Sequence, residues 1–132
     1  MEHVIVIKIG GVSSQHLSQE FIQQIKQWKA ENKQVVIVHG GGFAINQLME
    51  EEHVPITKKN GLRVTRQSDM KLVSYALLKI VGANLVKKLN QSSLDSVQLL
   101  SNMPKVVQAD FLDKATYGYV GNVSHIETEI LE

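Results

Sequence analysis

The chain has 132 residues, 43% of them hydrophobic, which fits one globular domain with a real core. Its 14 Lys and Arg side chains nearly balance 13 Asp and Glu, so the net charge of +1 excludes the clustered basic surface of a nucleic-acid-binding protein. The absence of cysteine excludes disulfides, thiolate metal sites and cysteine nucleophiles.

The amino-terminal part of the chain predicts a strand, a helix, a second strand and a second helix. Residues 4–7 and 35–38 are β-branched runs, each typical of a strand buried on both faces. After each run, apolar side chains recur at helical spacing. These side chains are Leu17, Phe21, Ile25 and Trp28 in the first helix and Ile45, Leu48 and Met49 in the second. A strand–helix–strand unit requires a crossover and therefore predicts parallel strands.

The middle of the chain predicts a hairpin followed by a long helix. Asn60-Gly61 lies between two β-capable stretches and predicts a hairpin over residues 57–64. Thr65 is a suitable N-cap, and Asp69 in the first turn favours a helix that continues to about Leu89. Its apolar face takes Met70, Val73, Leu77, Ile80, Val81 and Leu85.

The carboxy-terminal part predicts mostly extended structure. After a polar loop, residues 97–100 predict a third parallel strand, and residues 106–123 predict a β-hairpin. Residues 125–132 predict the first turns of another helix. The alternation of strands and helices indicates an α/β domain.

Two glycine clusters, Gly10-Gly11 and Gly40-Gly41-Gly42, each follow a predicted buried strand and precede a predicted helix. Ligands of parallel sheets bind beyond the carboxyl ends of the strands, so we expect both clusters to face one cleft. Glycine lets backbone N–H groups approach an anion closely, and the following helix adds its positive end. Lys8 adds a point charge to this predicted anion site.

The glycine pattern matches neither of two common nucleotide motifs. It is not the phosphate loop G-x-x-x-x-G-K-[ST], and it is not the dinucleotide-binding pattern G-x-G-x-x-G. Many α/β proteins also use glycine at strand-to-helix turns for structural reasons alone. The glycines by themselves therefore leave a binding role and a structural role open.

Three blocks resemble the amino-terminal signatures of the acetylglutamate kinases, a group within the amino-acid kinase fold. They are residues 6–11, residues 36–42 and the stretch Lys-Asn-Gly-Leu-Arg-Val-Thr at residues 59–65. Residues 118–121 resemble the next hairpin of that group, so the resemblance covers essentially the whole chain. The first two blocks indicate only the wider fold, which includes carbamate, aspartate and uridylate kinases, and the third block narrows it.

The resemblance implies a three-layer α/β/α sandwich with a mainly parallel sheet and added β-hairpins. Residues 1–132 would be its amino-terminal, substrate-binding lobe. The implied reaction is phosphorylation of the side-chain carboxylate of N-acetyl-L-glutamate by ATP with Mg²⁺, an early step of arginine synthesis. The implied assembly is a homodimer or higher homo-oligomer. No signal peptide or membrane span is evident, so we expect a cytoplasmic protein without a membrane or nucleic-acid partner.

Matching positions give the site residues that the resemblance implies. They are Lys8, Gly10 and Gly11 for the transferring phosphoryl group, and Gly40, Gly41, Gly42, Leu62 and Arg63 for the substrate. Arg63 would bind the α-carboxylate, because a guanidinium group makes two parallel hydrogen bonds with a planar carboxylate. The hairpin around Asn60-Gly61 would be a lid over the substrate.

Other polar residues receive no catalytic or metal role. His39 ends a predicted strand, which favours a hydrogen-bonded structural role. The remaining histidines lack metal-ligand spacing, so no metal site is expected. Residues 50–52 are all Glu and predict a solvated helix face.

The chain departs from the resemblance in two ways. That group carries a second half that binds the nucleotide, and the residues of that half cannot be placed in this chain. We therefore expect the chain to be inactive alone. Residues 100–104 read Leu-Ser-Asn-Met-Pro where the group has a glycine-rich turn with an aspartate. Two alternatives therefore remain, namely another enzyme of the fold acting on a different carboxylate or phosphate, and a non-catalytic small-molecule-binding module.

Overall fold

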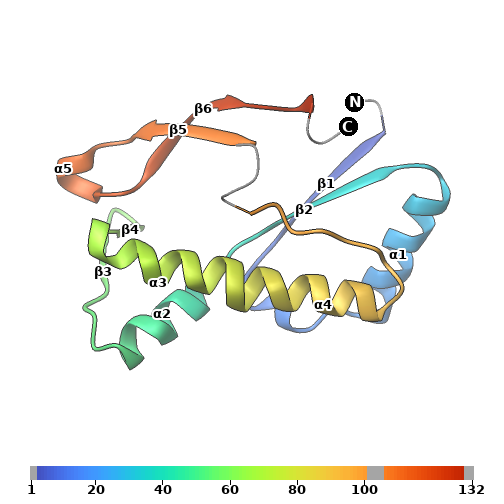
Figure 1. The fold of residues 1–132 in the computed structure, drawn as a ribbon, viewed down its shortest axis with the longest axis horizontal. Helices are drawn as coiled ribbons and strands as arrows, with labels where there is room; N and C mark the ends of the chain where they lie inside the picture. The colour runs from blue at the N-terminus through green and yellow to red at the C-terminus, as the bar shows by residue number, and fades with distance from the viewer. Residues whose placement is uncertain (1–2, 101–105, 130–132) are drawn as a thin grey trace.

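A computed structural model describes residues 3–100 and 106–129 of the chain. Strand β1 (Val4–Ile9) pairs in parallel with β2 (Gln34–His39), in register from Val4 opposite Gln34 to Ile9 opposite His39. Helix α1 (Gln19–Ala30) connects them, and α2 (Gly42–Glu51) follows β2 (Figure 1). The predicted strand–helix–strand–helix order and the parallel pairing are both confirmed.

Local side chains set the limits of α1. Ser18 is its N-cap, and its hydroxyl accepts a hydrogen bond from the Phe21 N–H at 3.1 Å. At the other end Asn32 adopts a positive φ of 57°, and the Lys33 N–H bonds the Trp28 carbonyl at 2.9 Å. A left-handed residue followed by such a bond is a common helix stop.

One face of the β1–β2 sheet carries the first hydrophobic core. The buried side chains of this core are Ile22 and Ile25 of α1, Leu85 and Leu89 of α4 (Ala83–Gln91), and Leu94. Ile7, Ile9, Val35 and Ile37 of the sheet pack against them. On the opposite face Val6 is 66% exposed and Val38 47%. The prediction that both strands are buried on both faces is therefore wrong within the described residues, because helices cover only one face there.

A long helical rod crosses the molecule (Figure 1). It begins with a 3₁₀ turn, Gln67–Asp69, and continues through α3 (Met70–Tyr75), a π-helical segment (Ala76–Gly82) and α4. The predicted helix is confirmed, but the prediction that Thr65 caps it is wrong. Thr65 is buried and its backbone bonds elsewhere, while the Asp69 carboxylate accepts a hydrogen bond from the Arg66 N–H at 3.1 Å.

The π-helical segment was not predicted, and a distant side chain is bonded to it. The amide nitrogen of Gln98 donates a hydrogen bond to the Leu78 carbonyl at 3.1 Å. A Cβ on Gly82 would lie 2.1 Å from the same nitrogen. A side chain inserted into the backbone ladder is a known cause of such helix irregularities. The third strand predicted at residues 97–100 is wrong, because this segment is irregular and Gln98 bonds the helix instead.

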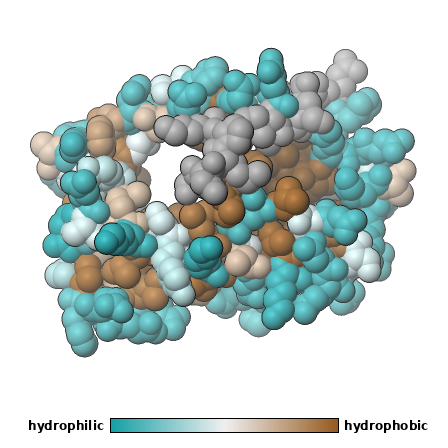
Figure 2. Space-filling model, in the orientation of Figure 1, coloured by the Kyte–Doolittle hydropathy of each residue, from teal (hydrophilic) through white to brown (hydrophobic). Residues whose placement is uncertain are grey.

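A second core lies between α2 and the first half of the rod. Its buried side chains are Ala44, Ile45, Met49, Ala76 and Val81. Figure 2 shows hydrophobic residues gathered over this part of a mainly hydrophilic face. Glu50, Glu51 and Glu52 are exposed, as predicted for the outer face of the second helix.

The hairpin predicted around Asn60-Gly61 is confirmed. Strand β3 (Thr57–Lys59) pairs antiparallel with β4 (Leu62–Val64), and Lys58 lies opposite Arg63. Asn60 and Gly61 have φ values of 52° and 78°, the two positive values of a type I′ turn.

A second hairpin, the β5–β6 arm, lies along the top of the molecule (Figure 1). It comprises β5 (Val107–Phe111), a short helix α5 (Lys114–Tyr117) and β6 (Gly121–Ile126), and every strand residue is exposed. The predicted hairpin is confirmed, although Tyr117 ends a helix rather than starting a strand. His125 belongs to β6, so the helix predicted from it is wrong at that residue, and residues 130–132 lie outside the described residues.

The tip of the arm docks beside the β3–β4 hairpin. The Thr65 N–H donates to the Tyr117 carbonyl at 3.0 Å, and the Tyr119 N–H donates to the Thr65 carbonyl at 2.6 Å. Gly118 lies opposite Thr65 with a φ of 68°. No described helix is long and apolar enough to cross a membrane.

Candidate functional site

The two glycine turns lie side by side at the carboxyl ends of β1 and β2, and the cleft expected between them stays a prediction. The Gly40 N–H donates to the Ile9 carbonyl at 3.2 Å and so continues the β1–β2 ladder into the turns. A Cβ on Gly11 would lie 3.1 Å from both the Gly40 carbonyl oxygen and the Gly41 Cα. The parallel register therefore places the backbones of the two turns side by side.

The glycines of the turns fall into a crowded group and an open group. Gly11 and Gly41 are crowded, because an added Cβ on Gly41 would lie 2.6 Å from Leu77 Cδ2. Gly10 and Gly42 have room for a Cβ, and nothing lies within 4 Å of one built on Gly42. Packing explains glycine at the crowded positions. It does not explain glycine at the open positions, where a bare backbone leaves the N–H groups within reach of a ligand.

The second turn opens directly into the amino terminus of α2. Gly41 is the N-cap, and no side chain caps the first N–H groups of this helix. The unpaired N–H groups of a first turn and the helix dipole together favour an anion. The first turn is braced differently, because the buried Ser14 hydroxyl donates to the Gly11 carbonyl at 2.6 Å. Sequence reasoning missed Ser14, and a hydroxyl three residues after the glycine pair was the available signal.

Lys8 lies two residues before the first turn, on the exposed face of the sheet. It is opposite Val38 in the register, and the alternation of β1 places it on the same face as Val6. The ion pairs of the described residues join Lys33 to Glu31 and Arg66 to Asp69, so Lys8 has no acidic partner among them. Its charge remains available on the open side of the strand ends.

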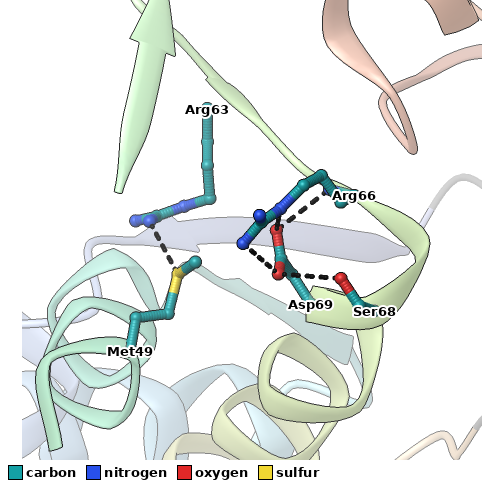
Figure 3. Close-up of polar contacts among 5 residues, drawn as sticks. All are labelled: Met49, Arg63, Arg66, Ser68 and Asp69. Carbon is teal, nitrogen blue, oxygen red and sulfur yellow. Dashed lines mark hydrogen bonds and ion pairs between the residues drawn. The ribbon is translucent and has the colours of Figure 1, made fainter. Parts of the chain in front are cut away.

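Arg63 extends from β4 onto α2 and is half-buried (Figure 3). One terminal nitrogen, Nη2, donates to the Asn46 side-chain oxygen, and the other, Nη1, lies 3.4 Å from Met49 Sδ. Asn46 is four residues after Gly42, about 6 Å along the helix. The guanidinium is therefore brought to the helix that begins at the second glycine turn. Leu62, the other predicted residue of the hairpin, is 40% exposed.

A second arginine, three residues later, has a different environment (Figure 3). Arg66 donates two hydrogen bonds to Asp69, from Nε at 3.0 Å and from Nη2 at 2.9 Å, and Ser68 adds a third contact at 3.3 Å. The hydrogen bonds from Arg66 hold the pKa of the buried Asp69 carboxyl below its usual value. Sequence reasoning did not separate the paired arginine from the unpaired one.

The remaining polar candidates make local contacts or none that converge. His39 Nδ1 lies 3.2 Å from the Gly40 carbonyl oxygen, a local hydrogen-bonding contact. Within residues 3–100 and 106–129 no three His, Asp or Glu side chains are grouped so as to hold a metal ion. The described residues therefore do not fit a protein-held Mg²⁺ site.

Two shallow hollows lie away from these residues. One of about 740 Å³ follows the outer face of α1, and one of about 450 Å³ follows α3 and the π-helical segment. Neither is lined by Lys8, by Arg63 or by a glycine of either turn. Gln, Glu and Lys side chains line the first hollow, and Met, Leu, Tyr, Ser and Lys side chains line the second. Neither lining brings anion-binding groups together, so the hollows are not the candidate site.

The arrangement has two chemical capabilities. The glycine turns, the α2 amino terminus and Lys8 supply donors and positive charge for a phosphoryl group. Arg63 supplies a planar guanidinium group for a carboxylate. It lies against α2 about one helical turn after the second glycine turn. A small molecule with a carboxylate and a phosphoryl acceptor would use both.

Comparison with known proteins agrees with this chemistry. Residues 3–132 match the amino acid kinase family. The chain is 60% identical to a protein named acetylglutamate kinase from Streptococcus mutans, 53% to one from Streptococcus sanguinis and 42% to one from Staphylococcus epidermidis. Each alignment covers 100% of this chain and 54% of the relative, so the chain spans about half the length of the curated relatives it matches.

Solved structures share the fold. A crystal structure from Streptococcus mutans UA159 superposes with a TM-score of 0.94 at 60% identity, over 99% of this chain and 54% of the other. N-acetylglutamate synthase from Neisseria gonorrhoeae, complexed with coenzyme A and N-acetyl-glutamate, has a TM-score of 0.66 at 19% identity, over 98% of this chain and 30% of the other. The second likeness concerns the fold alone.

Proposed function

Because this chain belongs to the amino acid kinase family, we propose that it provides the acetylglutamate-binding part of an acetylglutamate kinase. In that reaction a side-chain carboxylate oxygen of N-acetyl-L-glutamate forms a bond to the γ-phosphorus of ATP. The bond from that phosphorus to the bridging oxygen breaks, and ADP leaves. Such a transfer needs little covalent help, so the protein contributes positioning and charge stabilisation.

The observation that carries the proposal is the state of Arg63. It is a half-buried cation with no acidic partner among the described residues, and it lies on the helix that starts at the second glycine turn. Partial removal of a cation from water without a counter-charge costs free energy, and an anion that reaches it offsets that cost. The α-carboxylate of acetylglutamate is such an anion, and the names of the relatives support that choice.

We assign the remaining roles from the family resemblance, supported by the position of the two glycine turns at the strand ends. Lys8 and the N–H groups of Gly10 and Gly11 would stabilise the negative charge of the phosphoryl group during transfer. Gly40, Gly41 and Gly42, together with Leu62 of the β3–β4 hairpin, would hold the rest of the substrate. ATP is the expected phosphoryl donor of this family, and Mg²⁺ is proposed only as a companion of the ATP phosphates. We further propose a cytoplasmic homodimer or higher homo-oligomer.

Ligand selectivity tests the proposal. We would titrate the protein calorimetrically with N-acetyl-L-glutamate, L-aspartate, carbamate and uridine monophosphate. Saturable binding of acetylglutamate alone supports the assignment. Preferred binding of another of these ligands would assign the chain to a different enzyme of the fold. Failure of all four to bind would favour a non-catalytic module with another ligand.

A second assay addresses turnover. The protein would be incubated with radiolabelled ATP and acetylglutamate. From the sequence we expect no measurable product from this chain by itself. Measurable acyl phosphate would overturn that expectation and would strengthen the assignment.

A further inference from the structure

Asn46 contacts Arg63 but has no assigned role in the proposed reaction. We propose that Asn46 is a positioning residue that holds the Arg63 guanidinium ready for a substrate carboxylate. This inference rests on the proposed function, because it takes Arg63 as the carboxylate ligand. Asn46 lies on α2, and its side-chain oxygen accepts a hydrogen bond from Arg63 Nη2.

Arg63 needs such support because the hairpin that carries it offers little. Strand β4 has three residues, its partner β3 is fully exposed, and Leu62 beside Arg63 is 40% exposed. A long, flexible side chain on such a ribbon loses conformational entropy when it binds a ligand. Holding it in its bound geometry beforehand reduces that loss.

The groups that hold Arg63 do not cancel its charge. Asn46 supplies a neutral amide oxygen, and Met49, only 1% exposed and so fixed in the core, supplies a thioether sulfur 3.4 Å from Nη1. Arg66 differs, because the Asp69 carboxylate neutralises it. A neutral support leaves the remaining N–H donors and the full charge of Arg63 for an anion.

The neighbouring residue provides a matched control. Gln47 also lies on α2, but it points outward and its amide bonds Glu51 at 2.9 Å. Replacing either residue with Ala changes helix propensity in a similar way, yet only Asn46→Ala removes the contact to Arg63.

The first experiment measures binding to the full chain by calorimetry. The ligands are N-acetyl-L-glutamate and its analogue with a carboxamide in place of the α-carboxylate. We expect Asn46→Ala to weaken acetylglutamate binding by up to about tenfold, the cost of ordering one flexible side chain when the ligand binds. Binding of the carboxamide analogue should change less than about twofold, and Gln47→Ala should change neither. Equal weakening for both ligands, or none for acetylglutamate, would overturn the proposal.

The second experiment needs no ligand. NMR relaxation of the Arg63 Nε–H group reports the mobility of the guanidinium directly. Asn46→Ala should increase that mobility, whereas Gln47→Ala should not. If Arg63 stays equally rigid, the positioning role is wrong whatever the ligand. If Asn46→Ala releases Arg63 but the parent protein does not bind acetylglutamate, the proposed function is wrong while the contact still positions Arg63.

Discussion

Arg63 and Arg66 lie three residues apart and have opposite surroundings. Arg66 is paired by two hydrogen bonds with Asp69 at the start of the long helix, so its charge is already neutralised. Arg63 contacts an amide oxygen and a thioether and has no acidic partner within the described residues. The comparison shows that the partner, rather than the residue type, determines whether an arginine stabilises the fold or remains able to bind an anion.

Thr65 lies between the two arginines, and its backbone anchors the main chain of the segment that carries both. It is buried, and its N–H and carbonyl are bonded to Tyr117 and Tyr119 in the β5–β6 arm. Substitutions where the arm contacts Thr65 should therefore alter the positions of both arginines. Substitutions among the contacts of Arg63 or of Arg66 should alter the position of that arginine alone.

The largest expected effect comes from Gly118→Ala. Gly118 has a φ of 68°, and an added Cβ would lie 2.1 Å from the Thr65 carbonyl oxygen. Backbone strain and the collision together should lower the free energy of unfolding by about 3 kcal/mol or more. Urea denaturation measures the change.

Gly61→Ala separates the two causes. Gly61 also has a positive φ, of 78°, but nothing lies within 4 Å of an added Cβ. It should therefore show only the strain, about 1 kcal/mol. Equal destabilisation by the two substitutions would contradict the docking of the arm on Thr65.

A smaller loss of stability, through the contacts of Arg66 alone, is expected for Asp69→Asn. The substitution removes the ion pair and weakens the cap at the start of the helix, which should cost about 1–2 kcal/mol at neutral pH. Because the pKa of Asp69 is lowered in the folded state, mainly by hydrogen bonds from Arg66, its contribution is complete above the ordinary aspartate value of about 4. It is lost as pH falls through the lowered value.

The measurement is the unfolding free energy of both proteins from neutral pH to below about pH 3. The difference between the parent and Asp69→Asn should shrink as the pH falls. A difference that stays constant with pH would show that the charge of Asp69 does not stabilise the fold.

The smallest loss of stability is expected for Tyr117→Phe, which affects the hairpin that carries Arg63. The Tyr117 hydroxyl accepts a hydrogen bond from the Asn60 side chain at 2.9 Å, which links the arm to the β3–β4 hairpin. Loss of this exposed bond should cost about 0.5–1 kcal/mol and speed amide exchange in β4. Tyr75→Phe, at a tyrosine that is 55% exposed on α3, is the control and should leave exchange in β4 unchanged. Equal exchange rates in both variants would rule out this link.

Features that depend on neighbouring residues in the chain could be predicted from the sequence. Asn60-Gly61 specifies its own turn because both positions need a positive φ. The glycine turns converge because parallel pairing follows from a single crossover helix. Both predictions needed only short-range chemistry and the connectivity of strands.

Features that depend on distant partners could not be predicted. The π-helical segment is bonded by Gln98, which lies twenty residues beyond the Leu78 carbonyl that accepts the bond. The residues around Thr65 in the sequence make it a plausible N-cap. Its N–H and carbonyl instead bond the β5–β6 arm, which lies more than fifty residues later in the chain. The separate roles of Arg63 and Arg66 also depend on tertiary partners, Asn46 for one and Asp69 for the other.

The most direct test compares acetylglutamate binding in Arg63→Ala and Arg66→Ala by calorimetry, with melting temperatures measured on the same samples. We expect Arg63→Ala to weaken binding by about 10- to 100-fold with little change in melting temperature. Arg66→Ala should lower the melting temperature and change binding by less than about threefold. If Arg66→Ala weakened binding as much as Arg63→Ala, or if Arg63→Ala left it unchanged, the unpaired arginine would not be the carboxylate ligand.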